Sequence, residues 1–87
     1  MGNRKARSMK KRVLIIDDNL VVCKEIKYAL QNETTDVYYA LSIHDGIEQL
    51  TKHHFCLVIM EIHLSEGDGM ELLKILQLFK PIPILVI

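Results

Sequence analysis

Three carboxylates follow the two most apolar short segments of this 87-residue chain. Asp17 and Asp18 come directly after residues 13–16, and Glu61 comes directly after residues 57–60. Such short apolar runs are typical of parallel strands, and ligands bind at the carboxyl ends of those strands. Because carboxylate oxygens suit hard cations, the pattern predicts a shared metal site. The alternative is that one Asp caps the following helix and the other is solvated.

Helical and strand-like segments alternate along the rest of the chain. Apolar residues at helical spacing predict a first helix over about residues 20–31, and Ser42 with Asp45 resembles a capping box for a second helix. That second helix is expected to bury Ile43, Ile47 and Leu50, and Gly46 within it indicates a close neighbour. The other predicted elements are strands over 13–16, 36–40, 55–60 and 82–87, and a third helix beginning near Met70.

This order of elements predicts the fold class. Strands that alternate with helices favour an α/β fold with a parallel sheet, and right-handed crossovers place helices on both faces. A doubly wound sheet with strand order 2-1-3-4 puts the first and third strands side by side. Asp17, Asp18 and Glu61 then meet at one edge of that sheet.

The charge is distributed unevenly, although the formal net charge is zero. Six of the eleven basic residues lie in residues 1–12, whereas five lysines oppose eleven acids in residues 13–87, a formal charge of −6. We expect residues 1–12 to be a disordered basic tail and residues 13–87 to be the domain. Nucleic-acid contact through the tail is the less favoured alternative, because no aromatic residue or motif accompanies the charges. No apolar run approaches the ~18 residues of a membrane span, so a cytoplasmic protein with no membrane partner is expected.

The cysteines and histidines show no metal-binding or catalytic spacing. Cys23 and Cys56 each lie within an apolar pattern and are expected to be small buried hydrophobes. The four histidines form no HxxxH or HExxH motif, which favours ordinary surface residues.

The acidic positions resemble those of the receiver domain of bacterial two-component response regulators. The resemblance rests on Asp17-Asp18, on Glu61, and on the segment 66–73 (EGDGMELL), which is similar to the family's turn into its third helix. It covers about residues 12–87. It implies a flavodoxin-like fold and a signalling module that is not itself an enzyme.

The resemblance also implies a chemistry for these positions. In the family, Mg²⁺ is held by the acidic pair, by the phosphoacceptor Asp and by a main-chain carbonyl two residues later. Carried over, these are Asp17, Asp18, Glu61 and the carbonyl of His63. The partner implied is a histidine kinase or another phosphorelay protein.

Two departures from the family pattern modify this expectation. Glu61 stands where the family has Asp, so we expect impaired phosphotransfer and weak Mg²⁺ binding. The chain also ends before the positions of the family's fifth strand and last helices. It therefore lacks the positions of the hydroxyl residue and the Lys that contact the phosphate in that family. The exposed edge of the last strand is therefore expected to favour a homodimer or an exchange of elements.

Three hypotheses of different classes follow. The first is a receiver-type signalling module with impaired phosphotransfer, which we favour. The second is an interaction domain that binds a partner through its sheet edge and has a vestigial acidic cluster. The third is nucleic-acid binding through the basic tail.

Overall fold

The computed structural model describes residues 10–64, 69–79 and 81–87. Residues 1–9 of the predicted basic tail and residues 65–68 of the predicted turn lie outside the described residues. The described elements are β1 (Lys11–Ile16), α2 (Leu20–Leu30), β2 (Thr35–Ala40), α3 (Ile43–Lys52), β3 (Leu57–Met60), α4 (Gly69–Phe79) and β4 (Ile84–Val86). The first strand begins at Lys11, so the last two residues of the predicted tail belong to the sheet.

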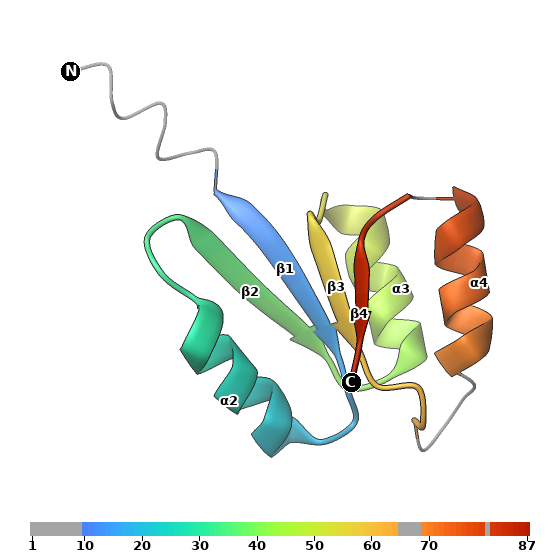
Figure 1. Ribbon diagram of the computed structural model, residues 1–87, viewed down its shortest axis with the longest axis horizontal. Coiled ribbons are helices and arrows are strands. Elements are labelled where there is room, and N and C mark those ends of the chain that lie inside the picture. Colours follow the sequence, from blue (N-terminus) through green and yellow to red (C-terminus); the bar gives the residue numbers. More distant parts are fainter. Residues whose placement is uncertain (1–9, 65–68, 80) are drawn as a thin grey trace.

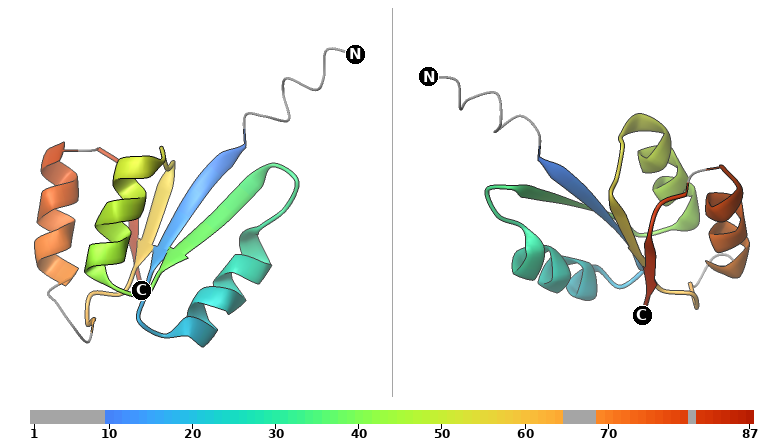
Figure 2. Two further views of the ribbon diagram at one scale, coloured as in Figure 1. Left: turned by 180° about the vertical axis from the view of Figure 1, so that it is seen from behind. Right: turned by 45° about the horizontal axis from the view of Figure 1, so that its top comes forward.

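The four strands form one parallel sheet in the order β2-β1-β3-β4, which confirms the predicted fold class and strand order. Helix α2 covers one face of the sheet, and α3 and α4 cover the other (Figures 1 and 2). The central strand β1 is therefore buried on both faces. This explains why residues 13–16 are continuously apolar rather than alternating with polar residues.

Each face of the sheet has its own core. The buried residues on the α3 and α4 face include Leu14, Ile16, Leu50, Val58, Met60, Leu72 and Leu76. Those on the α2 face are Val13, Ile15, Cys23, Val37 and Ile59. Alternate residues of β1 and β3 contribute to the two cores because successive side chains of a strand point to opposite faces.

The helix starts follow the expected capping chemistry. Asn19, rather than either Asp before it, caps α2, because its side-chain oxygen accepts hydrogen bonds from the backbone N–H groups of Val21 and Val22. Ser42 caps α3 by accepting from the backbone N–H of Asp45 at 3.1 Å. These bonds satisfy N–H groups that have no partner within the helix.

Two glycines allow close approach between elements. An ideal Cβ on Gly46 would lie 2.8 Å from Cδ1 of Ile16, so α3 rests directly on β1 there, as predicted. An ideal Cβ on Gly69 would lie 2.5 Å from the carbonyl oxygen of Ile62. Gly69 also donates its N–H to that oxygen at 3.2 Å, which ties the start of α4 to the loop after β3.

Two predictions about burial were wrong. Cys56 is exposed, because β3 begins at Leu57 instead of Phe55 and the thiol therefore lies before the strand. Ile47 is 38% exposed, because α3 turns Gly46 and Leu50 toward the sheet. The face of α3 that contacts the sheet is thus centred on a glycine, which an apolar pattern does not reveal.

Candidate functional site: the acidic end of the sheet

The strand ends bring Asp17 and Glu61 to the same edge of the sheet. Ile16 pairs with Met60 in the parallel ladder, and the N–H of Glu61 donates to the carbonyl oxygen of Ile16 at 3.0 Å. On the other side, the N–H of Asp17 donates to the carbonyl oxygen of Ala40 at 3.1 Å. The backbone thus holds Asp17 between its two neighbouring strands, and Glu61 follows the strand next to it. The predicted adjacency of the first and third strands is confirmed.

Asp17 is the buried member of the acidic pair, with only 5% of its surface exposed. Its Oδ1 accepts a hydrogen bond from the N–H of Asn19 at 2.9 Å, and its main-chain oxygen accepts from the thiol of Cys23 at 3.3 Å. Asp18, the next residue, is exposed. The pair therefore places one carboxylate at the sheet edge and one in the solvent-facing loop.

Glu61 is half-buried and its carboxylate turns toward its own loop. Oε1 accepts a hydrogen bond from the N–H of His63 at 3.0 Å. This is a local bond between residues two apart, of the kind that orders the loop after a strand end. The longer side chain of Glu61 thus hydrogen-bonds to its own loop instead of reaching the acidic pair.

The Cys23 thiol adjoins the acidic pair, a feature that the sequence pattern did not single out. Burial, together with the negative charges of Asp17 and Asp18, raises the pKa of this thiol to about 11. Cys23 lies six residues after Asp17, in the first turns of α2, so it faces back toward the strand end. The negative charges of the two aspartates thus add to the larger effect of burial on the pKa of this thiol.

The donor chemistry at this edge fits a hard cation. Two aspartates and a glutamate supply oxygen ligands of the kind that Mg²⁺ prefers, and one of them is buried. As the side chains stand, however, no group of three or more His, Cys, Asp or Glu residues that could hold a metal occurs within the described ranges. Metal binding would therefore require these side chains to move closer together.

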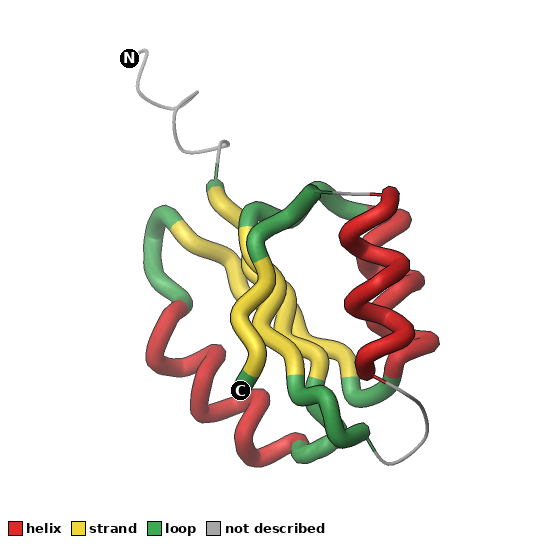
Figure 3. The backbone as a smooth tube through the Cα atoms, turned by 45° about the vertical axis from the view of Figure 1, so that its right-hand side comes forward, coloured by secondary structure: helices red, strands yellow, loops and turns green. Residues whose placement is uncertain are grey.

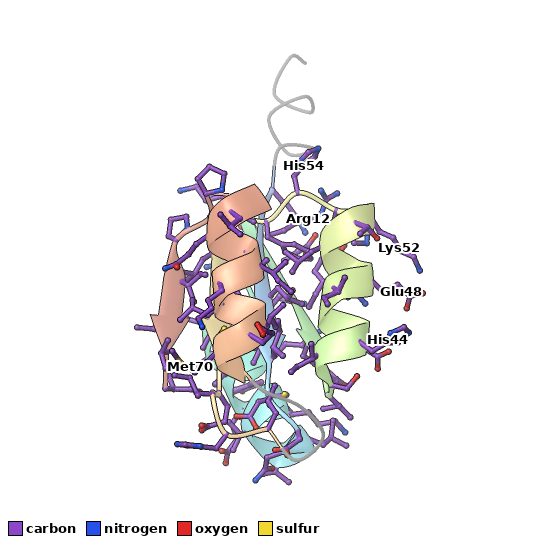
Figure 4. The ribbon with its side chains drawn as sticks, turned by 90° about the vertical axis from the view of Figure 1, so that its right-hand side faces the viewer. Arg12, His44, Glu48, Lys52, His54 and Met70 are labelled. Atoms are coloured by element: carbon purple, nitrogen blue, oxygen red, sulfur yellow. The ribbon has the colours of Figure 1, made fainter. Side chains whose placement is uncertain are left out.

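The histidines do not contribute a metal cluster within the described part of the chain. His44, His54 and His63 are exposed, whereas His53 packs against Tyr38, with ring centroids 4.8 Å apart. Figure 4 places His54 and Arg12 at one end of the molecule, with His44, Glu48 and Lys52 along α3. The predicted surface position is confirmed for the three exposed histidines, whereas His53 is a partly buried aromatic packing residue.

Comparison with known proteins identifies the family. The sequence profile described as the response regulator receiver domain matches residues 13–87. The chain belongs to this family. Receiver domains are signalling modules that typically bind Mg²⁺ at an acidic phosphorylation site and interact with histidine kinases or phosphotransfer proteins.

Individual relatives agree with this assignment. The chain is 32% identical over 77 residues to the sensory transduction protein LytT of Bacillus anthracis, covering 86% of this chain and 31% of that protein. It is 32% identical over 75 residues to the transcriptional regulatory protein ZraR of Salmonella typhimurium, covering 85% of this chain and 17% of that protein. The chain thus spans less than a third of the length of these curated relatives.

Solved structures show the same fold. A two-component response regulator from Clostridium difficile superposes with a TM-score of 0.83 at 27% identity, covering 88% of this chain and 64% of that one. The chemotaxis response regulator CheY4 of Vibrio cholerae superposes with a TM-score of 0.80 at 22% identity, covering 88% and 67%. No helix in the described residues is long and apolar enough to span a membrane.

Proposed function

We propose that this receiver domain takes part in phosphorelay signalling with impaired phosphotransfer, because Glu61 occupies the phosphoacceptor position. The observation that carries the proposal is the position and orientation of Glu61. Its backbone adjoins the end of β1, where an acceptor would lie, but its carboxylate accepts from the N–H of His63.

The extra methylene of Glu has a chemical consequence. In-line attack on a phosphoryl group needs close alignment of the nucleophilic oxygen, and a misplacement of ~1 Å can cost on the order of a hundredfold in rate. Glu61 extends its carboxylate one bond further than Asp would. It is also a poor imitation of a phosphorylated Asp, since a phosphoryl group adds nearly two charges and three acceptor oxygens.

Asp17, Asp18, Glu61 and the main-chain carbonyl of His63 are the groups that would hold Mg²⁺. The ion would neutralise negative charge on the phosphoryl group during its transfer. Asp17 would bind from a fixed position at the sheet edge, whereas Asp18 and Glu61 would have to reorient. We therefore propose weak Mg²⁺ binding, and a histidine kinase or phosphotransfer protein as the partner.

The acceptor chemistry is tested with acetyl phosphate and Mg²⁺, with the bound phosphoryl group detected by intact-protein mass spectrometry. The chain as it stands is expected to remain unmodified. Glu61→Asp is expected to gain one phosphoryl group, because it shortens the side chain and leaves the strand ends in place. Phosphorylation of the unaltered chain at Glu61 would refute the impairment. An unreactive Glu61→Asp chain would show that the acceptor residue alone does not explain it.

Mg²⁺ binding is tested separately by following backbone amide signals in an NMR titration with Mg²⁺ alone. The signals of Asp17, Asp18 and their neighbours are expected to move. Asp18→Asn is expected to weaken the response, whereas Glu48→Gln, which removes an equally exposed negative charge from α3, is expected to leave it intact. A chain whose acidic edge does not respond to Mg²⁺ would leave only the interaction-domain hypothesis.

A further inference from the structure

A groove lies between the second half of α2 and the outer side of β2. It has a volume of about 350 Å³, which is at the small end of the range for ligand pockets. Figure 3 shows the chain leaving α2, turning through a loop and returning as β2, so one continuous segment forms both walls. The described residues that line the groove are Lys27, Gln31, Asp36, Val37, Tyr38 and Tyr39.

The strand wall of the groove carries outward main-chain groups. The N–H of Asp17 donates to the carbonyl oxygen of Ala40, so in this parallel ladder the even-numbered residues of β2 bond to β1. Val37 and Tyr39 therefore point their N–H and C=O groups away from β1. The N–H of Tyr39 is thus available as a donor on the outer side of the strand.

The side chain of Gln31 is held with its oxygen toward the strand. Its Oε1 accepts a hydrogen bond from the N–H of Val37 at 3.1 Å. The oxygen and the NH₂ group of an amide point in different directions, so this bond turns the NH₂ group away from Val37. Gln31 therefore offers two N–H donors whose orientation is already fixed.

Lys27 supplies a positive charge to the same groove. It is partly buried, and its Nζ lies 5.9 Å from the centroid of the Tyr39 ring, within the range of a cation–π contact. No carboxylate of the described residues lies within ion-pair distance of Lys27. Asp36 is paired with Lys10 at 3.5 Å instead. Among the described residues that line the groove, one positive charge therefore remains uncompensated.

We infer that this groove binds a small organic carboxylate. A carboxylate carries a single negative charge and two acceptor oxygens, which match the ammonium group of Lys27 and the NH₂ group of Gln31. Tyr39 packs against the α2-side core and offers an apolar ring to the carbon atoms of the ligand.

The charge of the groove favours a carboxylate over a phosphate. A phosphate dianion would find one uncompensated positive charge for its two negative charges, and it would lie close to Asp36. The inference does not depend on chemistry at Glu61, because the groove and the acidic edge share no residue. Failure of either proposal therefore leaves the other untouched.

The experiment is an NMR titration of the ¹⁵N-labelled chain with sodium benzoate at constant ionic strength. The side-chain NH₂ signals of Gln31 and the backbone N–H signal of Tyr39 are expected to shift and to saturate at millimolar concentration. The side-chain signals of Gln49 on α3 and Gln77 on α4 are internal controls and are expected to stay in place. Benzamide, which has the same shape but no charge, is expected to cause little shift.

Two substitutions test the donors separately. Lys27→Gln is expected to weaken benzoate binding about tenfold, because it removes a charge-assisted hydrogen bond. Gln31→Glu keeps an oxygen acceptor for the N–H of Val37 but replaces the NH₂ donors with a negative charge, so binding followed at Tyr39 is expected to be lost. Lys52→Gln is the matched control: it removes the same charge from a 63% exposed side chain on α3 and is expected to leave binding unchanged.

The backbone amide spectrum of each variant checks that the fold is retained. Absence of a saturable shift at Gln31 and Tyr39 in the unaltered chain would overturn the inference, as would unchanged binding by both Lys27→Gln and Gln31→Glu. Shifts of equal size with benzamide would show that the ring alone is bound. Equal binding of inorganic phosphate, or equal weakening by Lys52→Gln, would show a general response to anions and would also overturn it.

Discussion

At the acidic edge, the functional groups of individual residues are held by hydrogen bonds to residues nearby in the chain. Asp17 is held by the N–H of Asn19, Glu61 by the N–H of His63, and Cys23 by the carbonyl oxygen of Asp17. Each bond orients one functional group with respect to a strand end or a helix start.

The thiol of Cys23 gives a pH dependence at this scale. Burial and the charges of Asp17 and Asp18 raise its pKa from 9.0 to about 11, so the folded chain keeps the thiol proton at a pH where the unfolded chain releases it. The folded state therefore binds more protons, and the free energy of unfolding falls as the pH rises from about 9 to about 11. Below that range Cys23 contributes no pH dependence.

The measurement is urea unfolding under reducing conditions at several pH values, compared with Cys23→Ala. The difference between the two proteins isolates the contribution of Cys23 from that of the rest of the chain. The free energy of unfolding of the wild type is expected to fall more steeply over this window. Parallel pH profiles would contradict the prediction.

At the level of elements, the approach of α3 to β1 determines the packing of the larger core. Gly46 lies against Ile16, which is fully buried, and Leu50 follows one turn later on the same side of the helix. Closer contact between helix and strand leaves Ile47 partly exposed. The glycine weakens the helix intrinsically, and the close contact with the sheet offsets that cost.

Gly46→Ala is expected to lower the free energy of unfolding by about 1–2 kcal/mol, because overpacking a buried contact outweighs the gain in helix propensity. The added Cβ would meet Cδ1 of Ile16, which Ile16→Val removes. Ile16→Val alone is expected to cost roughly 0.5–1.5 kcal/mol. Chemical denaturation of both single variants and the double variant measures the coupling.

The double variant is expected to be more stable than the sum of the two single effects predicts. This result would show that the contact between Gly46 and Ile16, rather than a general effect on α3, limits the size of the side chain at position 46. Simple additivity of the two effects would contradict it.

At the level of the whole molecule, the helices enclose the sheet from both faces. Helix α2 covers one face, and α3 and α4 cover the other (Figure 1). The segment between α2 and β2 also binds the outer side of β2, because the N–H of Val37 donates to the side-chain oxygen of Gln31 and the N–H of Asn32 donates to the carbonyl oxygen of Thr35.

The sequence by itself determined the order of elements, the strand order and the edge of the sheet at which Asp17 and Glu61 lie. These follow from apolar runs of strand length, helical spacing and the handedness of crossovers, all of which are local or nearly so. The resemblance carried by Asp17, Asp18 and Glu61 led to the family that the comparisons establish. Patterns in the chain suffice for these features because the period of the apolar residues distinguishes strands from helices, and crossover rules limit how they are connected.

Only the tertiary structure decided which side chains are buried and which hydrogen-bond partners they have. Ile47 and Cys56 are exposed against the sequence-based expectation. The hydrogen bond from the N–H of His63 to Glu61 and that from the N–H of Val37 to Gln31 likewise depend on the folded loops. The physical reason is that burial and hydrogen-bond partners depend on the exact placement of elements that are distant in the chain.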